Sequence, residues 1–162
     1  MPQEDISKEQ VKTPLLDAIE HALEQPSYQF HIPGHTKGKG VYPKFKRLIG
    51  QQALLLDTTD EFDGLGTLTP ATGPIKEAED LASEAFHSKR TYFLLNGSTT
   101  GNIATAMGLT KQGQKVIVNR NCHRSILTGL MISGAEPVWV CPNRIEDWSI
   151  WGNIEAWQIE EL

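Results

Sequence analysis

The sequence predicts an α/β fold built on a parallel sheet, and the order of its apolar segments is the main reason. Apolar runs of strand length at 91–95, 115–119 and 137–141 alternate with segments of helical periodicity at 97–107 and 126–131. The connections between them are short and contain glycine or polar residues. Because parallel neighbours need a crossover of helical length, this order predicts a three-stranded parallel sheet.

The composition is that of an ordinary globular protein. A length of 162 residues allows one domain with its own core, and 39% hydrophobic with 22% charged residues is typical of the class. The net charge of −5 argues against a nucleic-acid-binding protein. We expect no membrane partner and a cytoplasmic location, since no apolar run is long enough to cross a bilayer and the acidic N-terminus is unlike a signal peptide. Two cysteines, Cys122 and Cys141, suggest no disulfide framework.

A short helical arm is expected near the N-terminus, after about twelve polar residues that we expect to be loose. Thr13 is a good helix cap and Pro14 suits the first helical position. The residues that follow form an apolar stripe at helical spacing: Leu15, Leu16, Ile19 and Leu23. Because this stripe needs a cover, we expect the arm to pack on another domain or another subunit.

The next segment is predicted to be a loop that carries two histidines. Pro33-Gly34 excludes a helix, so His31 and His35 do not form an i, i+4 metal pair. Together with Lys37, they form either a solvated turn or a rim of an active site that faces an anion or carboxylate.

Two further segments precede the first long helix. Residues 51–56 are predicted to be a short strand or a helical turn, and 57–63 carry four carboxylates. The spacing of Asp57–Asp63 does not fit an EF-hand, so we expect a solvated acidic loop and no metal site. Residues 64–73 lack periodicity, and an aperiodic segment of that length is either disordered or functional.

A clear amphipathic helix is predicted to begin at Gly73-Pro74. Its apolar face comprises Ile75, Ala78, Leu81, Ala82, Ala85 and Phe86. The opposite face is charged, and the helix leads into the first apolar run, which we expect to be a buried central strand.

The junction after that run has the chemistry of a phosphate site. Gly97, Ser98, Thr99, Thr100 and Gly101 lie at the start of a helix, where backbone N–H groups lack partners and the helix dipole favours an anion. No lysine follows as in a Walker A loop, and the glycine spacing is not that of a dinucleotide fingerprint. The segment therefore indicates a single phosphate, as on a phosphorylated cofactor or metabolite, although the same residues also serve as plain helix caps.

A second polar segment, 121–124, follows the next predicted strand. Ligands of parallel sheets bind beyond the carboxyl ends of the strands, so this segment and the phosphate junction should share one edge. Beyond the third strand, Asn153 is a candidate cap for a final short helix. A three-stranded sheet with open edges is an unusual end point, so we expect the chain to be the front of a larger protein.

Four segments, in this order, resemble the N-terminal part of the Orn/Lys/Arg decarboxylase family, pyridoxal-phosphate enzymes of the aspartate-aminotransferase fold (fold type I). They are Phe30–His35, Gly73–Glu79, Asn96–Asn102 and Arg120–Ser125. The resemblance covers about residues 13–153. It is to forms without a receiver-like wing domain, as in cyanobacteria and Gram-positive bacteria.

The resemblance implies roles for matching residues. Gly97, Ser98, Thr99 and Thr100 would hold the phosphate of pyridoxal 5′-phosphate, and His123 would stack on the pyridine ring and face the substrate. The alternative for His123 is a histidine at a helix start that is satisfied by the backbone. A metal role for Cys122, His123 and Cys141 is not expected, because the spacing does not fit a zinc knuckle.

The resemblance also implies what the chain lacks. The Schiff-base lysine of the family, in a Ser-x-His-Lys setting, and the aspartate that pairs with the pyridine nitrogen would lie downstream of the last residue. We therefore expect a chain that is inactive alone and that works as part of a homodimer or with a complementing C-terminal half. Residues 65–70 are less acidic than in relatives, so the substrate is not fixed.

The resulting prediction is pyridoxal-phosphate-dependent decarboxylation of arginine, lysine or ornithine to a polyamine precursor. Residues 1–72 would form the arm and the rim or dimer-interface loops, and 73–162 part of the cofactor-binding large domain. The alternatives are a non-catalytic module that binds a cofactor or protein, and another fold type I enzyme such as an aminotransferase or β-eliminating lyase.

Overall fold

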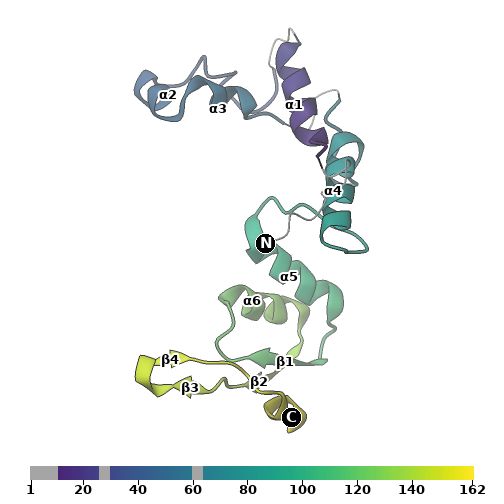
Figure 1. The fold of residues 1–162 in the computed structure, drawn as a ribbon, viewed down its shortest axis with the longest axis vertical. Coiled ribbons are helices and arrows are strands. Elements are labelled where there is room, and N and C mark those ends of the chain that lie inside the picture. Colours follow the sequence, from purple (N-terminus) through teal and green to yellow (C-terminus); the bar gives the residue numbers. More distant parts are fainter. Residues whose placement is uncertain (1–10, 26–29, 60–63) are drawn as a thin grey trace. The chain divides into compact units, whose positions relative to one another are not determined.

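A computed structural model describes residues 11–25, 30–59 and 64–162 and divides the chain into two compact units, Met1–Phe93 and Leu94–Leu162 (Figure 1). Within the described residues the fold mixes helices with parallel strands, as the sequence predicts. The first twelve residues or so were expected to be loose, and residues 1–10 of this segment lie outside the described residues. The functional boundary expected after residue 72 stays a prediction.

The first unit is helical where it is described. It contains α1 (Pro14–Glu24), α2 (Pro43–Ile49), α3 (Gln51–Leu56) and α4 (Gly73–Ala85). Proline stands at the first or second position of α1, α2 and α4, where its missing N–H costs no hydrogen bond. The sequence analysis missed α2, which spans only seven residues; its apolar residues Phe45, Leu48 and Ile49 have helical spacing, but none of them is buried.

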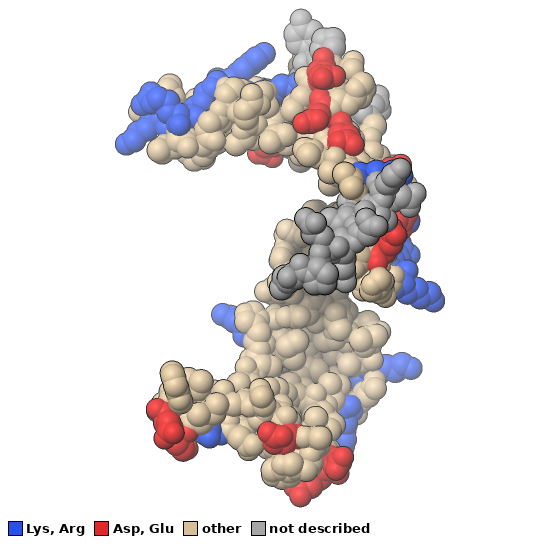
Figure 2. All heavy atoms as spheres, in the orientation of Figure 1, with Lys and Arg blue, Asp and Glu red and all other residues tan. Residues whose placement is uncertain are grey.

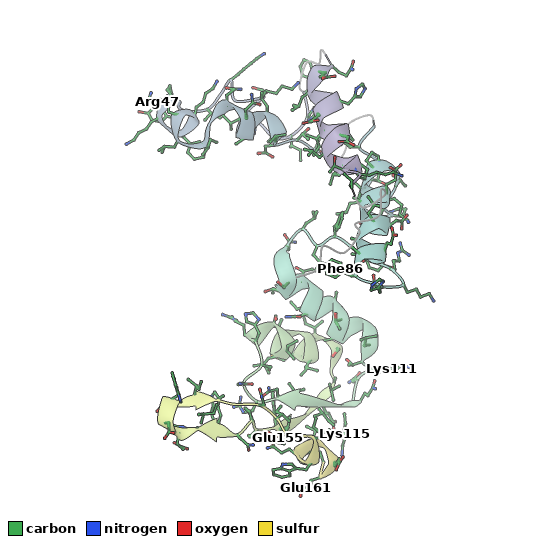
Figure 3. All side chains as sticks on the ribbon, viewed as in Figure 1. Arg47, Phe86, Lys111, Lys115, Glu155 and Glu161 are labelled. Atoms are coloured by element: carbon green, nitrogen blue, oxygen red, sulfur yellow. The ribbon has the colours of Figure 1, made fainter. Side chains whose placement is uncertain are left out.

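The N-terminal arm packs against α4. Leu15 and Leu16 of α1 line a shallow groove with Ala78, Leu81 and Ala82 of α4. This chain's own helix therefore covers part of the stripe, while Leu16 stays 49% exposed, and packing of the arm on another domain or subunit stays a prediction. Phe86, expected on the same face, lies just beyond α4 and is 81% exposed (Figure 3).

The aperiodic segment 64–72 is an ordered turn. Thr67 and Thr72 hold it closed: the Thr67 N–H donates to Thr72 Oγ1 at 2.9 Å, and the Thr72 N–H donates to the Thr67 carbonyl at 2.9 Å. Leu65 is buried beneath it. Of the two alternatives open for this segment, disorder is excluded for its described part.

The second unit is a small α/β layer structure. Helix α5 (Gly97–Leu109) leads through a turn, flanked by Lys111 and Lys115 in Figure 3, to β1 (Lys115–Asn119), and α6 (Arg124–Ser133) connects β1 to β2 (Glu136–Val140). The strands are parallel, with Lys115 opposite Glu136 and Asn119 opposite Val140. The core beneath α6 is made of Val118, Leu130 and Ala135, with Val116, Cys122 and Ile126 packed around it.

The predicted central strand is wrong. Residues 91–95 have no strand pairing in the described part of the chain, and Tyr92 and Leu95 are 61% and 78% exposed. An apolar run becomes a strand only when a neighbour pairs with its backbone. Here the Phe93 N–H instead donates to a carboxylate oxygen of buried Glu79 at 3.0 Å, so the described parallel sheet is two-stranded, not three-stranded.

The end of the chain also differs from the prediction. An antiparallel hairpin of β3 (Arg144–Ile145) and β4 (Ile150–Trp151), joined by the 3₁₀ turn η1 (Glu146–Trp148), was not expected. The last helix, α7, spans Ala156–Glu160 and is capped by Glu155 in a reciprocal capping box with Gln158. The predicted cap, Asn153, lies before this box and is wrong, because the Glu-x-x-Gln pair satisfies both orphan N–H groups itself.

Candidate functional site

The start of α5 is an open helix N-terminus. Asn96 is the N-cap residue but its side chain makes no capping hydrogen bond, and Gly97 takes a left-handed φ of 69° with open space where a side chain would lie. Ser98 and Thr99 are exposed in the first turn. Thr100 Oγ1 donates back to the Asn96 carbonyl at 3.3 Å. The first-turn N–H groups are thus left to an external acceptor.

The start of α6 is capped by a histidine. His123 has the extended backbone typical of an N-cap, and its Nδ1 accepts from the Ser125 N–H at 3.2 Å. Nδ1 also lies 2.7 Å from Ser125 Oγ. Nδ1 of His123 is therefore hydrogen-bonded to the backbone, as in the alternative prediction for this residue. Nevertheless the ring is exposed, and Nε2 has no hydrogen-bond partner among the described residues.

Helices α5 and α6 lie side by side and run in the same direction (Figure 1). Asn102 Nδ2 donates to Ser125 Oγ at 2.8 Å, and two turns further on Thr110 Oγ1 donates to Ser133 Oγ at 2.9 Å. Both pairs are 23 residues apart in the sequence, so the helices are in register. The two helix starts therefore lie at the same end of this unit, as the sequence analysis expected of the two polar segments.

The contact between these helices depends on Gly129. A Cβ at this position would lie 2.7 Å from Ala106 Cβ and 3.2 Å from Ile103 Cα. These distances are too short for a side chain, so glycine allows the backbones to approach closely. The close approach holds the two N-termini next to each other.

The electrostatics of this end favour an anion. Helices α5 and α6 contain no acidic residue, and Arg124 in the first turn of α6 is their one charged side chain. Figure 2 shows a largely uncharged surface over this part of the unit. Two parallel helix dipoles then present their positive ends together. The arrangement can bind a phosphate or carboxylate without a metal ion.

An apolar pocket lies beyond the carboxyl ends of β1 and β2. It is lined by Arg120, Asn121, Cys141, Pro142 and Trp151. The Arg120 guanidinium lies 5.2 Å from the centre of the Trp139 ring, at a distance typical of a cation–π contact. Sequence analysis missed Arg120 and Trp151 as pocket residues, because the hairpin that carries Trp151 gave no recognisable turn signal.

The histidine loop of the first unit holds a contact that the sequence did not reveal. His35 Nε2 lies 3.2 Å from Asp57 Oδ2, and its Nδ1 accepts from the Gly38 N–H at 3.1 Å. His31 Nδ1 instead lies 2.6 Å from the Ile32 carbonyl oxygen, so the two histidines do not converge. The separation of His35 and Asp57 by 22 residues across loops left no periodic signal.

The described residues bear on the expectations about a metal site and a membrane span. In 11–25, 30–59 and 64–162, no three His, Cys, Asp or Glu side chains gather in a way suited to a metal ion, and Cys122 and Cys141 are free thiols. Of the acidic segment Asp57–Asp63, residues 60–63 lie outside the described residues. No described helix has the length and apolar character to span a membrane.

Comparison with known proteins shows which protein family this chain resembles. The model of a family described as "Orn/Lys/Arg decarboxylase, major domain" matches residues 13–162. The arginine decarboxylase of Bacillus subtilis is 41% identical over 134 residues, covering 82% of this chain and 27% of that protein. A lysine decarboxylase of Pseudomonas aeruginosa is 35% identical over 133 residues, covering 79% of this chain and 18% of its own length.

A solved structure shares the fold. The constitutive lysine decarboxylase of Escherichia coli superposes with a TM-score of 0.78 at 30% identity, over 91% of this chain and 21% of that one. The chain thus spans about a quarter of the length of the curated arginine decarboxylase that it matches.

Proposed function

The chain belongs to the Orn/Lys/Arg decarboxylase family, and on that basis we propose that it takes part in the pyridoxal-phosphate-dependent decarboxylation of a basic amino acid. The substrate is arginine, lysine or ornithine, and the product is a polyamine precursor. Within this proposal the parallel strands and helices are part of a fold type I large domain. The names of the relatives, which include both arginine and lysine decarboxylases, support the substrate class.

The observation that carries the proposal is the open N-terminus of α5 beside the capped N-terminus of α6. A cofactor phosphate needs several donors at one point, and Gly97, Ser98 and Thr99 offer first-turn N–H groups and two exposed hydroxyls. Gly97 has room on its side-chain face, so a phosphate can approach the backbone. Thr100 contributes mainly through its N–H, since its hydroxyl already donates to Asn96.

His123 is the proposed platform for the pyridine ring. Its exposed imidazole stands at the neighbouring helix start, held through Nδ1, and an aromatic face beside a phosphate site suits a flat phosphorylated ring. When bound, pyridoxal phosphate supplies an electron sink for the electron pair left when the α-carboxylate departs as CO₂. This chain's part is to hold the phosphate, orient the ring and shield its face from water.

Several finer points stay predictions. They are the homodimer or complementing half, the division at residue 72, the cytoplasmic location and the placement of the 31–37 loop at the rim of the site. The His35–Asp57 contact supports an ordered loop at that place.

Titration of the intact chain with pyridoxal phosphate tests the binding part of the proposal. Charge-assisted hydrogen bonds contribute roughly 1.5–3 kcal/mol each, but immobilising the ligand offsets most of this, so we expect a Kd on the order of 100 μM to 1 mM. Inorganic phosphate should compete. A chain that binds neither ligand at millimolar concentration would contradict the proposed phosphate site.

A chimera tests the reaction. The matched stretch of the Bacillus subtilis arginine decarboxylase is replaced by this chain, and CO₂ release from arginine, lysine and ornithine is measured. We expect pyridoxal-phosphate-dependent release that falls when Ser98 and Thr99 are both replaced by Ala. Binding by the chain without release by a well-folded chimera would favour a non-catalytic cofactor-binding module.

A further inference from the structure

A short series of hydrogen bonds runs from α5 to the ring of His123. Asn102 Nδ2 donates to Ser125 Oγ at 2.8 Å, and Ser125 Oγ lies 2.7 Å from His123 Nδ1. Ser125 is 1% exposed, although it is a serine in the first turn of a helix. A buried hydroxyl with two polar partners is held in one orientation, because breaking either hydrogen bond leaves a buried polar group unsatisfied, which costs free energy.

The direction of these bonds follows from the backbone. The Ser125 N–H, 3.2 Å from Nδ1, can only donate, so Nδ1 carries a lone pair and no proton. Ser125 Oγ already accepts from the Asn102 amide, which leaves its hydroxyl proton for the same lone pair. Two donors therefore converge on Nδ1, and the proton of the neutral imidazole is on Nε2.

We propose that Asn102 and Ser125 are positioning residues that fix His123 as the Nε2–H tautomer and hold its ring at the shared start of α5 and α6. The tautomer follows from the hydrogen bonds alone. Its use in orienting a cofactor ring rests on the proposed function.

The proposal determines what the free edge of His123 can do. Nε2–H is an exposed donor, so it suits an oxygen acceptor on a ligand, such as a carboxylate. In this state Nε2 cannot take up a proton. His123 therefore serves as a platform and donor, and not as a general base at Nε2.

Long-range ¹H–¹⁵N NMR of the imidazole in the intact chain measures the tautomer directly, because an unprotonated ring nitrogen resonates far from an N–H nitrogen. Spectra are recorded at alkaline pH. His123→Ala identifies the signals. We expect Nδ1 to be unprotonated and Nε2 to carry the proton; the reverse would overturn the proposal.

Two variants change the series in different ways. In Asn102→Asp the carboxylate accepts the Ser125 hydroxyl proton, so Oγ turns a lone pair towards Nδ1 and the Nδ1–H tautomer should gain population. In Ser125→Ala only the longer backbone hydrogen bond remains, and both nitrogen signals should move towards their average. If neither variant moves the signals in a folded chain, Asn102 and Ser125 do not set the tautomer.

Ser133→Ala is the matched control. It removes the other side-chain hydrogen bond between α5 and α6, at the far end of the helices, and should leave the His123 signals unchanged. An equal change in all three variants would mean general loosening of the helix pair and would overturn a positioning role.

The consequence for the cofactor is measured separately. Pyridoxal phosphate should bind about twofold more weakly to Ser125→Ala, the low end for one neutral hydrogen bond, and equally well to Ser133→Ala. Absence of cofactor binding in the unmodified chain would contradict the proposed function, while the tautomer result would still stand or fall on the NMR signals. Binding that Ser125→Ala leaves unchanged would overturn the role in orienting the cofactor.

Discussion

Two helix N-termini lie next to each other in the Leu94–Leu162 unit, and only one of them has a side-chain cap. At α6, the side chain of His123 accepts the Ser125 N–H and closes the helix start. At α5, the Asn96 side chain caps nothing, and the hydroxyls of Ser98 and Thr99 are exposed. We propose that a ligand completes the open end of α5, since its first-turn N–H groups have no side-chain cap and lie beside the start of α6.

The comparison also supports the proposal that one histidine and three hydroxyl residues form one site. The self-capped helix presents a ring, and the uncapped helix presents N–H groups. The register of 102 with 125 and 110 with 133 brings the ring and the N–H groups to one end. The substitutions below separate the two helices, remove the hydroxyls at the start of α5, or cap α5 as α6 is capped.

Separating the helices should have the largest effect. In Gly129→Val the new side chain would meet Ala106 and the backbone at Ile103, so we expect the free energy of unfolding to fall by about 3 kcal/mol and cofactor binding to be lost. Urea unfolding followed by circular dichroism measures the first effect.

Gly108→Ala is the control for that substitution. Gly108 lies in α5 with open space around it, so alanine should raise stability by up to about 1 kcal/mol through helix propensity. Equal stability of the two variants would show that the close approach of α5 and α6 is not what Gly129 provides.

Removing the free hydroxyls of α5 should have the next largest effect on binding. The double change Ser98→Ala and Thr99→Ala is expected to weaken pyridoxal phosphate about tenfold, the low end for hydrogen bonds to a charged group. Thr100→Ala should weaken it much less, since that hydroxyl already donates to the Asn96 carbonyl. Isothermal titration at constant salt compares the variants, and an equal loss in both would mean that the exposed hydroxyls are not special.

Closing the open end should have a smaller effect. In Asn96→Asp the added carboxylate would act as a cap and place a negative charge where the phosphate binds. We expect affinity for pyridoxal phosphate to fall about fivefold, and stability to rise by about 0.5 kcal/mol at low salt. Unchanged affinity would place the phosphate away from the start of α5.

The elements that could be predicted from the sequence are those whose signal lies within one continuous segment. The strand at 115–119 and the helices that begin at Pro14, Gly73 and Gly97 follow from local periodicity and caps, and the structure contains them. The strand predicted at 137–141 is found at 136–140, and the helix predicted at 126–131 spans 124–133. The run at 91–95 has the same apolar character, but a strand needs a partner, and no sequence pattern supplies one. Similarly, Asn153 looks like a cap only if the Glu155–Gln158 pair is overlooked.

The candidate site shows the same division. The phosphate-type start of α5 was visible from Gly97 to Thr100 because it is one continuous segment. The series from Asn102 through Ser125 to His123 was not, since it joins residues 23 positions apart through the register of two helices. His35 and Asp57 were likewise apart in sequence and close in space.

The central claim is that the two helix ends bind different parts of one ligand, and His123→Ala tests it most directly. Titrations with pyridoxal phosphate and with inorganic phosphate are followed by NMR in the unmodified chain and in this variant. We predict about threefold weaker binding of pyridoxal phosphate, through lost ring stacking, with phosphate binding unchanged. Equal weakening of both ligands, or of neither, would contradict the assignment of His123 as the ring platform.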